Sequence, residues 1–304
     1  DGSPGNRIGE WPDVVDLDYS HSELWDYQIE TLKYWASMVD GFRCDVASLV
    51  PLEFWLRARD EVESVRPGCF WLSESIDPAF IARTRAQGIP SLSDSEIYQA
   101  FDVSYEYDIF THFREYLMGK IPLARYAEYV NQQETIYPDN YVKLRYLENH
   151  DNLRASFIIP DETALLNWTA FLYFQKGMVL LYGGQEVGCA HLPSLFDKDP
   201  VNWDFAADRS EQLRYFYTMK QNPLITNGAY HVQAMIDDIL YATYSSKEKQ
   251  LIGIFSLKGA SSLVTVAAPD GIYVNLADGS NVEVKFNHIC CHGVPIIFET
   301  SRVE

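Results

Sequence analysis

The sequence contains few cysteines, and their number and spacing form no disulfide framework. There are five in 304 residues, an odd count. Cys290 and Cys291 are neighbours, and their Cα atoms, about 3.8 Å apart, are closer than an unstrained disulfide allows. Cys44 and Cys69 fall within segments that we predict as buried strands. We therefore expect free, buried thiols and a reducing, cytoplasmic location.

Long apolar runs and metal-binding motifs are also missing. No run of about 18 apolar residues is present, which argues against a membrane-spanning segment. The chain has no Asp-x-Asp-x-Asp-Gly calcium loop and no Cys/His spacing typical of a metal site. We therefore predict no metal site and no cofactor.

Basic residues are in the minority. The sequence contains 24 Lys and Arg but 43 Asp and Glu, so the net charge is −19. Nucleic acids and anionic membrane surfaces attract basic patches, so this balance argues against both partners. Apolar residues make up 47% of the chain, enough for a sizeable core. The length predicts one large domain and a smaller one.

Strand-like and helix-like segments alternate up to about residue 227, which predicts parallel βαβ units and an α/β fold. Ser20 and Glu23 have the spacing of a capping box at the start of the first helix. The predicted helices are 20–38, one from about 51 to 66, 78–87, 109–118, 123–133, 161–176 and 210–221. The predicted strands are 41–46, 69–74, 101–107, 141–147 and 178–182.

The pattern changes after Asn227-Gly228. Short alternating segments separated by Lys, Gly and Asp predict an antiparallel β module, most simply a small β-sandwich. The predicted strands are 230–235, 239–245, 251–257, 263–267 and 294–298. We therefore predict two domains, residues 1–227 and residues 228–304.

The segment 41–46 has the clearest site-like pattern. On a strand, Arg43 and Asp45 share one face, while Phe42, Cys44 and Val46 share the other. An Arg two residues from an Asp can keep the Asp ionised. The pair is either part of a functional site or a structural ion pair, and this motif alone does not decide between them.

Two further stretches extend the pattern. Gly41-Phe42-Arg43-x-Asp45-x-Ala47 resembles the fourth-strand motif of the α-amylase family of glycoside hydrolases. Phe70-Trp71-Leu72-Ser73-Glu74-Ser75 resembles its fifth-strand motif, and Glu148-Asn149-His150-Asp151-Asn152 its seventh. The three motifs occur in the order of the family, and the segment 177–186 resembles its eighth-strand motif.

The resemblance implies a (β/α)8 TIM-type barrel followed by a C-terminal antiparallel β domain. Only about the last five βα units are recognisable, whereas a closed barrel has eight. At about 30 residues per unit, roughly 90 or more residues are expected upstream of Asp1. We therefore expect the chain to be a fragment, inactive alone if those strands are truly absent.

The resemblance also implies the roles of the site residues. Asp45 would be the nucleophile, Glu74 the general acid and base, and Asp151 the third carboxylate. Arg43 and His150 would contact the substrate. Each residue alone has a plainer interpretation: Glu74 as a solvated loop carboxylate, the run 149–151 as a helix N-cap cluster, and His150 as a structural histidine or, less often, a metal ligand.

The function implied is a retaining glycoside hydrolase that cleaves α-glucosidic bonds, α-1,4 above all, in starch, glycogen or maltooligosaccharides. The alternatives are a glycosyltransferase or isomerase of the same family, or a non-catalytic relative that binds a glycan or a partner. Ser48-Leu49 stands where the family often has Lys-His, so the calcium ion often bound near that His is possible but unsupported by this sequence.

Overall fold

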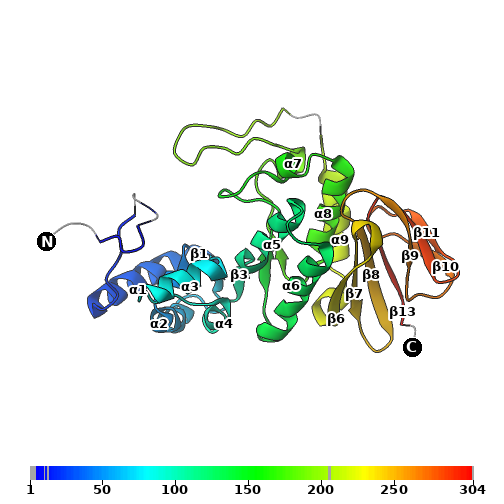
Figure 1. The fold of residues 1–304 in the computed structure, drawn as a ribbon. Helices are drawn as coiled ribbons and strands as arrows, with labels where there is room; N and C mark the ends of the chain where they lie inside the picture. Colours follow the sequence, from blue (N-terminus) through cyan, green and yellow to red (C-terminus); the bar gives the residue numbers. More distant parts are fainter. Residues whose placement is uncertain (1–4, 10, 12–13, 205–206, 303–304) are drawn as a thin grey trace. The chain divides into compact units, whose positions relative to one another are not determined.

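The computed structural model describes residues 5–9, 11, 14–204 and 207–302. These residues form two compact units, each with a core of its own. The first unit consists of Asp1–Asp108 and Tyr137–Lys143, and the second of Ile109–Ile136 and Leu144–Glu304. Figure 1 labels many of the helices and strands of both units.

Parallel strands alternate with helices along the chain. In the first unit, β1 (Gly41–Cys44), β2 (Phe70–Ser73) and β3 (Val103–Tyr105) pair in parallel in this order. β4 (Lys143–Arg145) crosses into the second unit, where it pairs in parallel with β5 (Met178–Val179). The sheet order β1-β2-β3-β4-β5 follows the chain order, which confirms the predicted α/β fold with five parallel strands of the barrel type.

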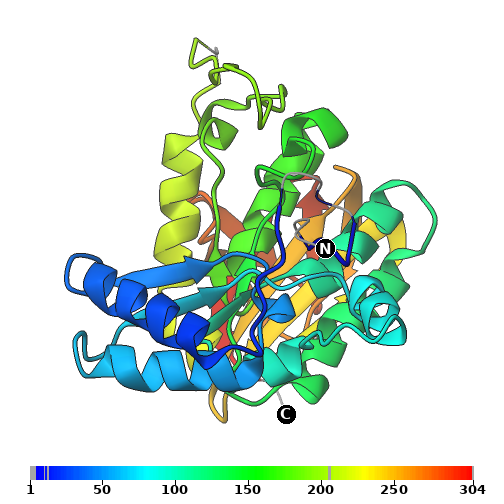
Figure 2. The ribbon, with the colours of Figure 1, turned by 90° about the vertical axis from the view of Figure 1, so that its left-hand side faces the viewer.

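The helices of the first unit cover one face of its strands. Cys44 of β1 and Trp71 of β2 are part of the same core cluster as Phe54 and Trp55 of α2, and the partly buried Phe42 of β1 packs against this cluster. This confirms Phe42 and Cys44 on the apolar face of β1, but the predicted extension to residue 46 is wrong, because β1 ends at Cys44 and Val46 is left-handed. Figure 2 shows α1 and α2, which are in contact, side by side. The helices are α1 (Ser22–Ala36), η1 (Ala47–Leu49), α2 (Leu52–Glu63), α3 (Pro78–Ala86) and α4 (Asp94–Ile97).

The second unit is built around the buried helix α8 (Glu162–Phe174), which the sequence predicts as a long apolar helix. Trp168 lies at its centre and packs edge-on against Phe113 and Phe171. None of the helices that the structure describes is long and apolar enough to span a membrane. The other helices are α5 (Tyr107–Leu117, which begins in the first unit), α6 (Leu123–Ile136), α7 (Ala155–Ile158), η2 (Gln185–Val187), α9 (Ser210–Lys220) and α10 (Pro223–Asn227).

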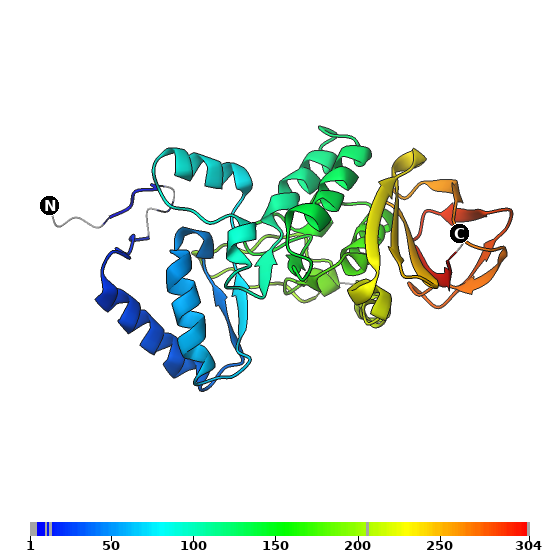
Figure 3. The ribbon, with the colours of Figure 1, turned by 90° about the horizontal axis from the view of Figure 1, so that it is seen from below.

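The strands after α10 form antiparallel sheets that enclose a second core. One sheet has the order β13-β8-β7-β6, and two further pairs are β12-β9 and β10-β11. Ile252 and Phe298 of the large sheet share a core with Val264 and Ile289 of the β9–β12 pair, and Figure 3 shows these strands gathered together. The bounds are β6 (Ala229–Ala234), η3 (Ile236–Asp238), β7 (Ile239–Ser245), β8 (Lys249–Ser256), β9 (Ser261–Thr265), β10 (Gly271–Val274), β11 (Asn281–Val284), β12 (His288–His292) and β13 (Ile296–Ser301).

The antiparallel β domain is confirmed, but the boundary between residues 227 and 228 stays a prediction. It falls between α10, which ends at Asn227, and β6, which begins at Ala229. Asn167 of α8 accepts a hydrogen bond from the Ser256 N–H of β8 at 2.8 Å and donates one to the Gly293 carbonyl at 2.7 Å. The β domain is therefore joined to α8 within the second unit.

The predicted capping box of the first helix is wrong. α1 begins at Ser22 after the N-cap His21, whose side chain makes no capping hydrogen bond. Ser20 instead donates its N–H to Asp18 Oδ1 at 3.0 Å, so it belongs to a turn before the helix. A capping box opens α4, where the Ser93 N–H donates to Glu96 Oε2 at 2.7 Å.

Candidate active site

The ends of β1 and β2 bring Arg43, Asp45 and Glu74 together in the first unit. The two strands pair in parallel up to Cys44 and Ser73. Beyond them the Glu74 N–H donates to the Cys44 carbonyl at 3.0 Å. The Glu74 carbonyl also accepts from the Ala47 N–H at 3.0 Å, so main-chain pairing continues past both strand ends and places Glu74 next to Asp45.

Arg43 binds both carboxyl groups through one guanidinium. Its Nη1 pairs with Asp45 Oδ1, and its Nη2 lies 2.6 Å from Glu74 Oε1. The guanidinium also lies 5.6 Å from the ring centroid of Tyr105. Burial lowers the pKa of Arg43, but the charge of Glu74 and the hydrogen bonds to Asp45 and Tyr105 raise this pKa above its ordinary value. Arg43 thus stays charged and holds the two acids side by side.

The two carboxyl groups have different environments. The Asp45 side chain is 76% exposed, whereas that of Glu74 is 10% exposed. Burial raises the pKa of Glu74, and the charge of Asp45 raises it further, while the N–H of Val46 and the charge of Arg43 oppose the shift. Glu74 is therefore a buried group and not a solvated loop carboxylate. A raised pKa suits an acid, and an exposed carboxylate beside it suits a nucleophile.

The backbone between Asp45 and η1 is strained. Val46 has φ 42° and ψ 40°, in the left-handed region that a β-branched residue rarely adopts. In this conformation its N–H donates to Glu74 Oε2 at 2.9 Å. Strain of this kind costs of order 1–3 kcal/mol and is concentrated at functional sites. The strained residue thus contributes a direct hydrogen bond to the buried acid.

The thiol of Cys44, which precedes Asp45, is unsuited to act as a nucleophile. Its side chain is buried on the helix-facing side of β1. Burial raises the pKa of the Cys44 thiol to about 12. The thiol is therefore protonated near neutral pH, which leaves the neighbouring carboxylates as the reactive groups.

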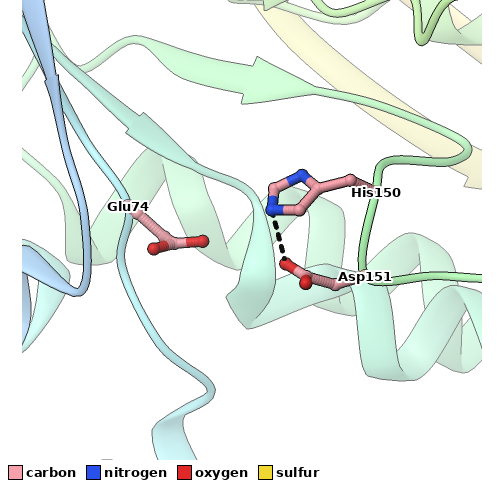
Figure 4. Close-up of side chains that lie close together, drawn as sticks. All are labelled: Glu74, His150 and Asp151. Carbon is pink, nitrogen blue, oxygen red and sulfur yellow. Dashed lines mark ion pairs between the residues drawn. The ribbon is translucent and has the colours of Figure 1, made fainter. Parts of the chain in front are cut away.

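His150 and Asp151 lie in the second unit, on the loop that follows β4. His150 Nε2 pairs with Asp151 Oδ2 at 3.3 Å, drawn as a dashed line in Figure 4. Asn149 Oδ1 accepts hydrogen bonds from the Asp151 N–H at 3.0 Å and from Asn152 Nδ2 at 2.7 Å. The helix after this loop, α7, has its N-cap at Arg154, so the run 149–151 does not cap it.

A buried ion pair at the base of this loop was not predicted from the sequence. Glu148 Oε1 lies 2.7 Å from Arg154 Nη1, and both side chains are fully buried. Burial raises the pKa of Glu148, and the bonds from Arg154 and from the Ala155 N–H oppose the shift. The only sequence signal is a Glu and an Arg that flank Asn149-His150-Asp151, six residues apart.

The segment 177–186 makes the sharp turns that its glycines predict. Gly177 and Gly184 have φ values of 119° and 96°. A Cβ on Gly184 would lie 2.9 Å from Val201 and 3.1 Å from the side chain of Cys189, so only glycine fits there. The segment thus connects β5 to η2 through a turn in which neighbouring side chains leave no room for a larger residue at Gly184.

Within each unit taken alone, the described residues contain no three His, Cys, Asp or Glu side chains close enough to share a metal ion. The predicted absence of a metal stays a prediction. The structure thus places Arg43, Asp45 and Glu74 together in one unit, and His150 and Asp151 together in the other. The convergence of Asp45, Glu74 and Asp151 concerns both units and also stays a prediction.

Comparison with known proteins assigns both parts of the chain to families. Residues 10–223 match the model of the alpha amylase catalytic domain, and residues 231–298 match that of the bacterial alpha amylase C-terminal domain. An alpha-amylase of Lactobacillus plantarum has a similar crystal structure, with a TM-score of 0.95, 40% identity, and coverage of 98% of this chain and 71% of that chain.

Two curated relatives are more distant. Alpha-amylase 2 of Dictyoglomus thermophilum is 19% identical over 280 residues, which are 87% of this chain and 47% of that protein. The intracellular maltogenic amylase of Bacillus subtilis is 23% identical over 263 residues, 83% of this chain and 43% of that protein. The chain thus spans less than half the length of these two relatives. With a catalytic-domain match over more than two thirds of its residues, the chain belongs to the α-amylase family of glycoside hydrolases.

Proposed function

We propose that the protein is a retaining glycoside hydrolase that cleaves α-1,4-glucosidic bonds in starch, glycogen or maltooligosaccharides. The observation that carries the proposal is the single guanidinium of Arg43 bound to one exposed and one buried carboxyl group. Two carboxyl groups on one guanidinium must lie close together. This favours the retaining separation of about 5–5.5 Å over the inverting separation of about 6.5–9.5 Å.

In this mechanism Asp45 attacks the anomeric carbon, and the bond between that carbon and the leaving-group oxygen breaks. Glu74 gives its proton to that oxygen. Glu74 then removes a proton from water, which attacks the anomeric carbon and releases Asp45. Asp151 stabilises the positive charge on the sugar ring, and His150 donates a hydrogen bond to a sugar hydroxyl. All chemical roles are thus assigned to side chains, with no metal or cofactor.

The anomeric configuration of the first product tests this proposal. The full-length protein should release the α-anomer first from a maltooligosaccharide, because two displacements at one carbon restore the starting configuration. Proton NMR during the first turnovers distinguishes it from the β-anomer. A β-anomer appearing first overturns the retaining mechanism, and products longer than the substrate assign the protein to the glycosyltransferases of the family.

Replacing Arg43 by Met should move the alkaline limb of the pH profile of kcat/KM to higher pH. The charge of Arg43 lowers the pKa of Glu74, so its removal raises this pKa. An acid catalyst is active below its pKa, so a raised pKa extends activity upward. The matched control is Arg59→Met, which removes the 2.6 Å pair with Asp102 in the same unit. A limb that stays in place or moves down contradicts the assignment of Glu74.

We also propose a cytoplasmic location. All five cysteines are free, and Cys44, Cys69, Cys189 and Cys291 are buried, but Cys290 is exposed, so the predicted burial is wrong for that thiol. Free buried thiols are typical of reducing compartments. The Bacillus subtilis relative, an intracellular maltogenic amylase by name, supports the same location.

A further inference from the structure

We propose that Arg154, paired with Glu148, is a positioning residue that fixes the loop carrying His150 and Asp151. The inference rests on the proposed function, in which these two residues contact the sugar. Arg154 itself is fully buried in the second unit and cannot touch a substrate. Its effect on the reaction must therefore pass through the loop that it holds.

The pair closes the base of the loop. Glu148 follows β4, and Arg154 immediately precedes α7. The Glu148 carboxylate uses both oxygens: Oε1 accepts from Arg154 Nη1 at 2.7 Å, and Oε2 accepts from the Ala155 N–H at 2.6 Å. Both ends of the segment 149–153 are thus bound to one buried carboxylate, while Asn149 fixes the segment from within.

The remaining donors of Arg154 reach the loop that follows β5. Its Nη2 donates to the Gly183 carbonyl at 2.9 Å, and its Nε donates to the His191 carbonyl at 3.0 Å. The face of the guanidinium lies 4.1 Å from the ring centroid of Tyr182. Arg154 therefore links the loop after β4 to the loop after β5 and restricts the movement of one loop relative to the other.

This geometry requires the planar fork of arginine. One guanidinium serves a carboxylate and two carbonyls in three directions, and it stacks on an aromatic ring at the same time. A Lys ammonium keeps the charge but cannot reach all three acceptors or stack in this way. An apolar pair would fill the same space but would form no hydrogen bonds to the loop. The Arg154–Glu148 pair therefore does more than compensate two buried charges.

The test compares a charge-balanced double variant with the wild type. Arg154→Met alone would leave Glu148 buried without its cation, and an uncompensated buried charge can by itself prevent folding. Glu148→Gln with Arg154→Met removes both charges and keeps an acceptor for the Ala155 N–H. Arg154→Lys is the conservative variant. Arg145→Met is the matched control, because Arg145 is equally buried on β4 and bonds Gln133 and the Lys176 carbonyl instead.

Two readouts separate positioning from stability. Hydrogen exchange should become faster in residues 149–155 and 183–191 of the double variant, and less so in Arg154→Lys. The kcat for an aryl α-maltoside should fall by about 100-fold, the cost of misplacing a group by about 1 Å, while KM changes much less. Arg145→Met should match the wild type in kcat and in the exchange of these segments.

The outcomes distinguish this inference from the proposed function. A folded double variant with wild-type kcat, measured well below its unfolding temperature, overturns the positioning role. The positioning role is also overturned if hydrogen exchange in residues 149–155 of the double variant is as slow as in the wild type. An Asp151→Asn variant with full activity overturns the role proposed for Asp151, whereas the exchange experiment still decides whether Arg154 fixes the loop.

Discussion

Replacing Asp45 by Asn should lower kcat on an aryl α-maltoside by about 10⁴–10⁶-fold, the usual cost of removing a central catalytic group. The amide keeps the size of the side chain and can still accept a hydrogen bond from Arg43. It is a poor nucleophile, so the covalent intermediate cannot form. Steady-state kinetics of the full-length protein measure the loss, and intact-protein mass spectrometry tests for the glycosyl-enzyme with a slow substrate.

The control for this experiment lies at the other end of the same strand. Asp40 precedes β1, is exposed, and pairs with Arg66. Asp40→Asn should leave kcat within a few-fold of the wild type. Equal rates for Asp45→Asn and the wild type would remove Asp45 from the mechanism and favour the non-catalytic interpretation of the chain.

The same substitution has a second consequence for Glu74. The charge of Asp45 contributes to the raised pKa of Glu74, so this pKa should fall in Asp45→Asn. Burial is the largest cause of the raised pKa of Glu74, so part of the increase should remain in the variant. A change in the titration of Glu74, followed by infrared or NMR spectroscopy, thus reports whether the two carboxyl groups act as a coupled pair.

The sequence predicted the parallel part of the fold because each element has a strong local pattern. The run 41–46 has turn residues at both ends, and α8 is apolar on all sides, so each is recognisable alone. The strands β10, β11 and β12 were missed. Ile272 and Val274 of β10 are 72% and 57% exposed, so their apolar character does not mark a buried face. β12 contains two histidines and two cysteines, which have little strand preference.

The site was predicted as a set of residues but not as a set of contacts. The strand pattern places Arg43 beside Asp45, but its bond to Glu74 depends on the register of β1 against β2. The left-handed conformation of Val46 has no local signal, because a β-branched residue argues against it. Glu148 and Arg154 were missed because a buried ion pair becomes visible only once the chain folds both charges inside.

A network of buried charges around Lys143 predicts the largest effect on stability. Lys143 is fully buried and pairs with Asp94 and, at 3.0 Å, with Asp108 Oδ1. Tyr137 donates its hydroxyl to Asp108 Oδ2 at 2.8 Å, and its ring centroid lies 4.4 Å from Lys143 Nζ. Burial lowers the pKa of Lys143, but the two carboxylates raise it well above the ordinary value. One cation thus compensates two buried acids in the first unit.

Replacing Lys143 by Met should lower the free energy of unfolding by about 3–5 kcal/mol, because two buried carboxylates lose their cation. Urea denaturation followed by tryptophan fluorescence measures the loss. Lys143 lowers the pKa of Asp94 against the raising effect of burial, so without Lys143 this pKa rises further in the folded protein. The folded state then binds more protons than the unfolded one, and the loss of stability grows with rising pH.

Two controls show whether that loss comes from the buried network of Lys143, Asp94 and Asp108. Adding Asp94→Asn to Lys143→Met should recover part of the lost unfolding free energy, because it removes one of the two uncompensated buried charges. Lys249→Met, which breaks the exposed pair with Glu299, should cost at most about 1 kcal/mol. A similar small loss for Lys143→Met would show that the buried charges contribute little to holding the first unit together.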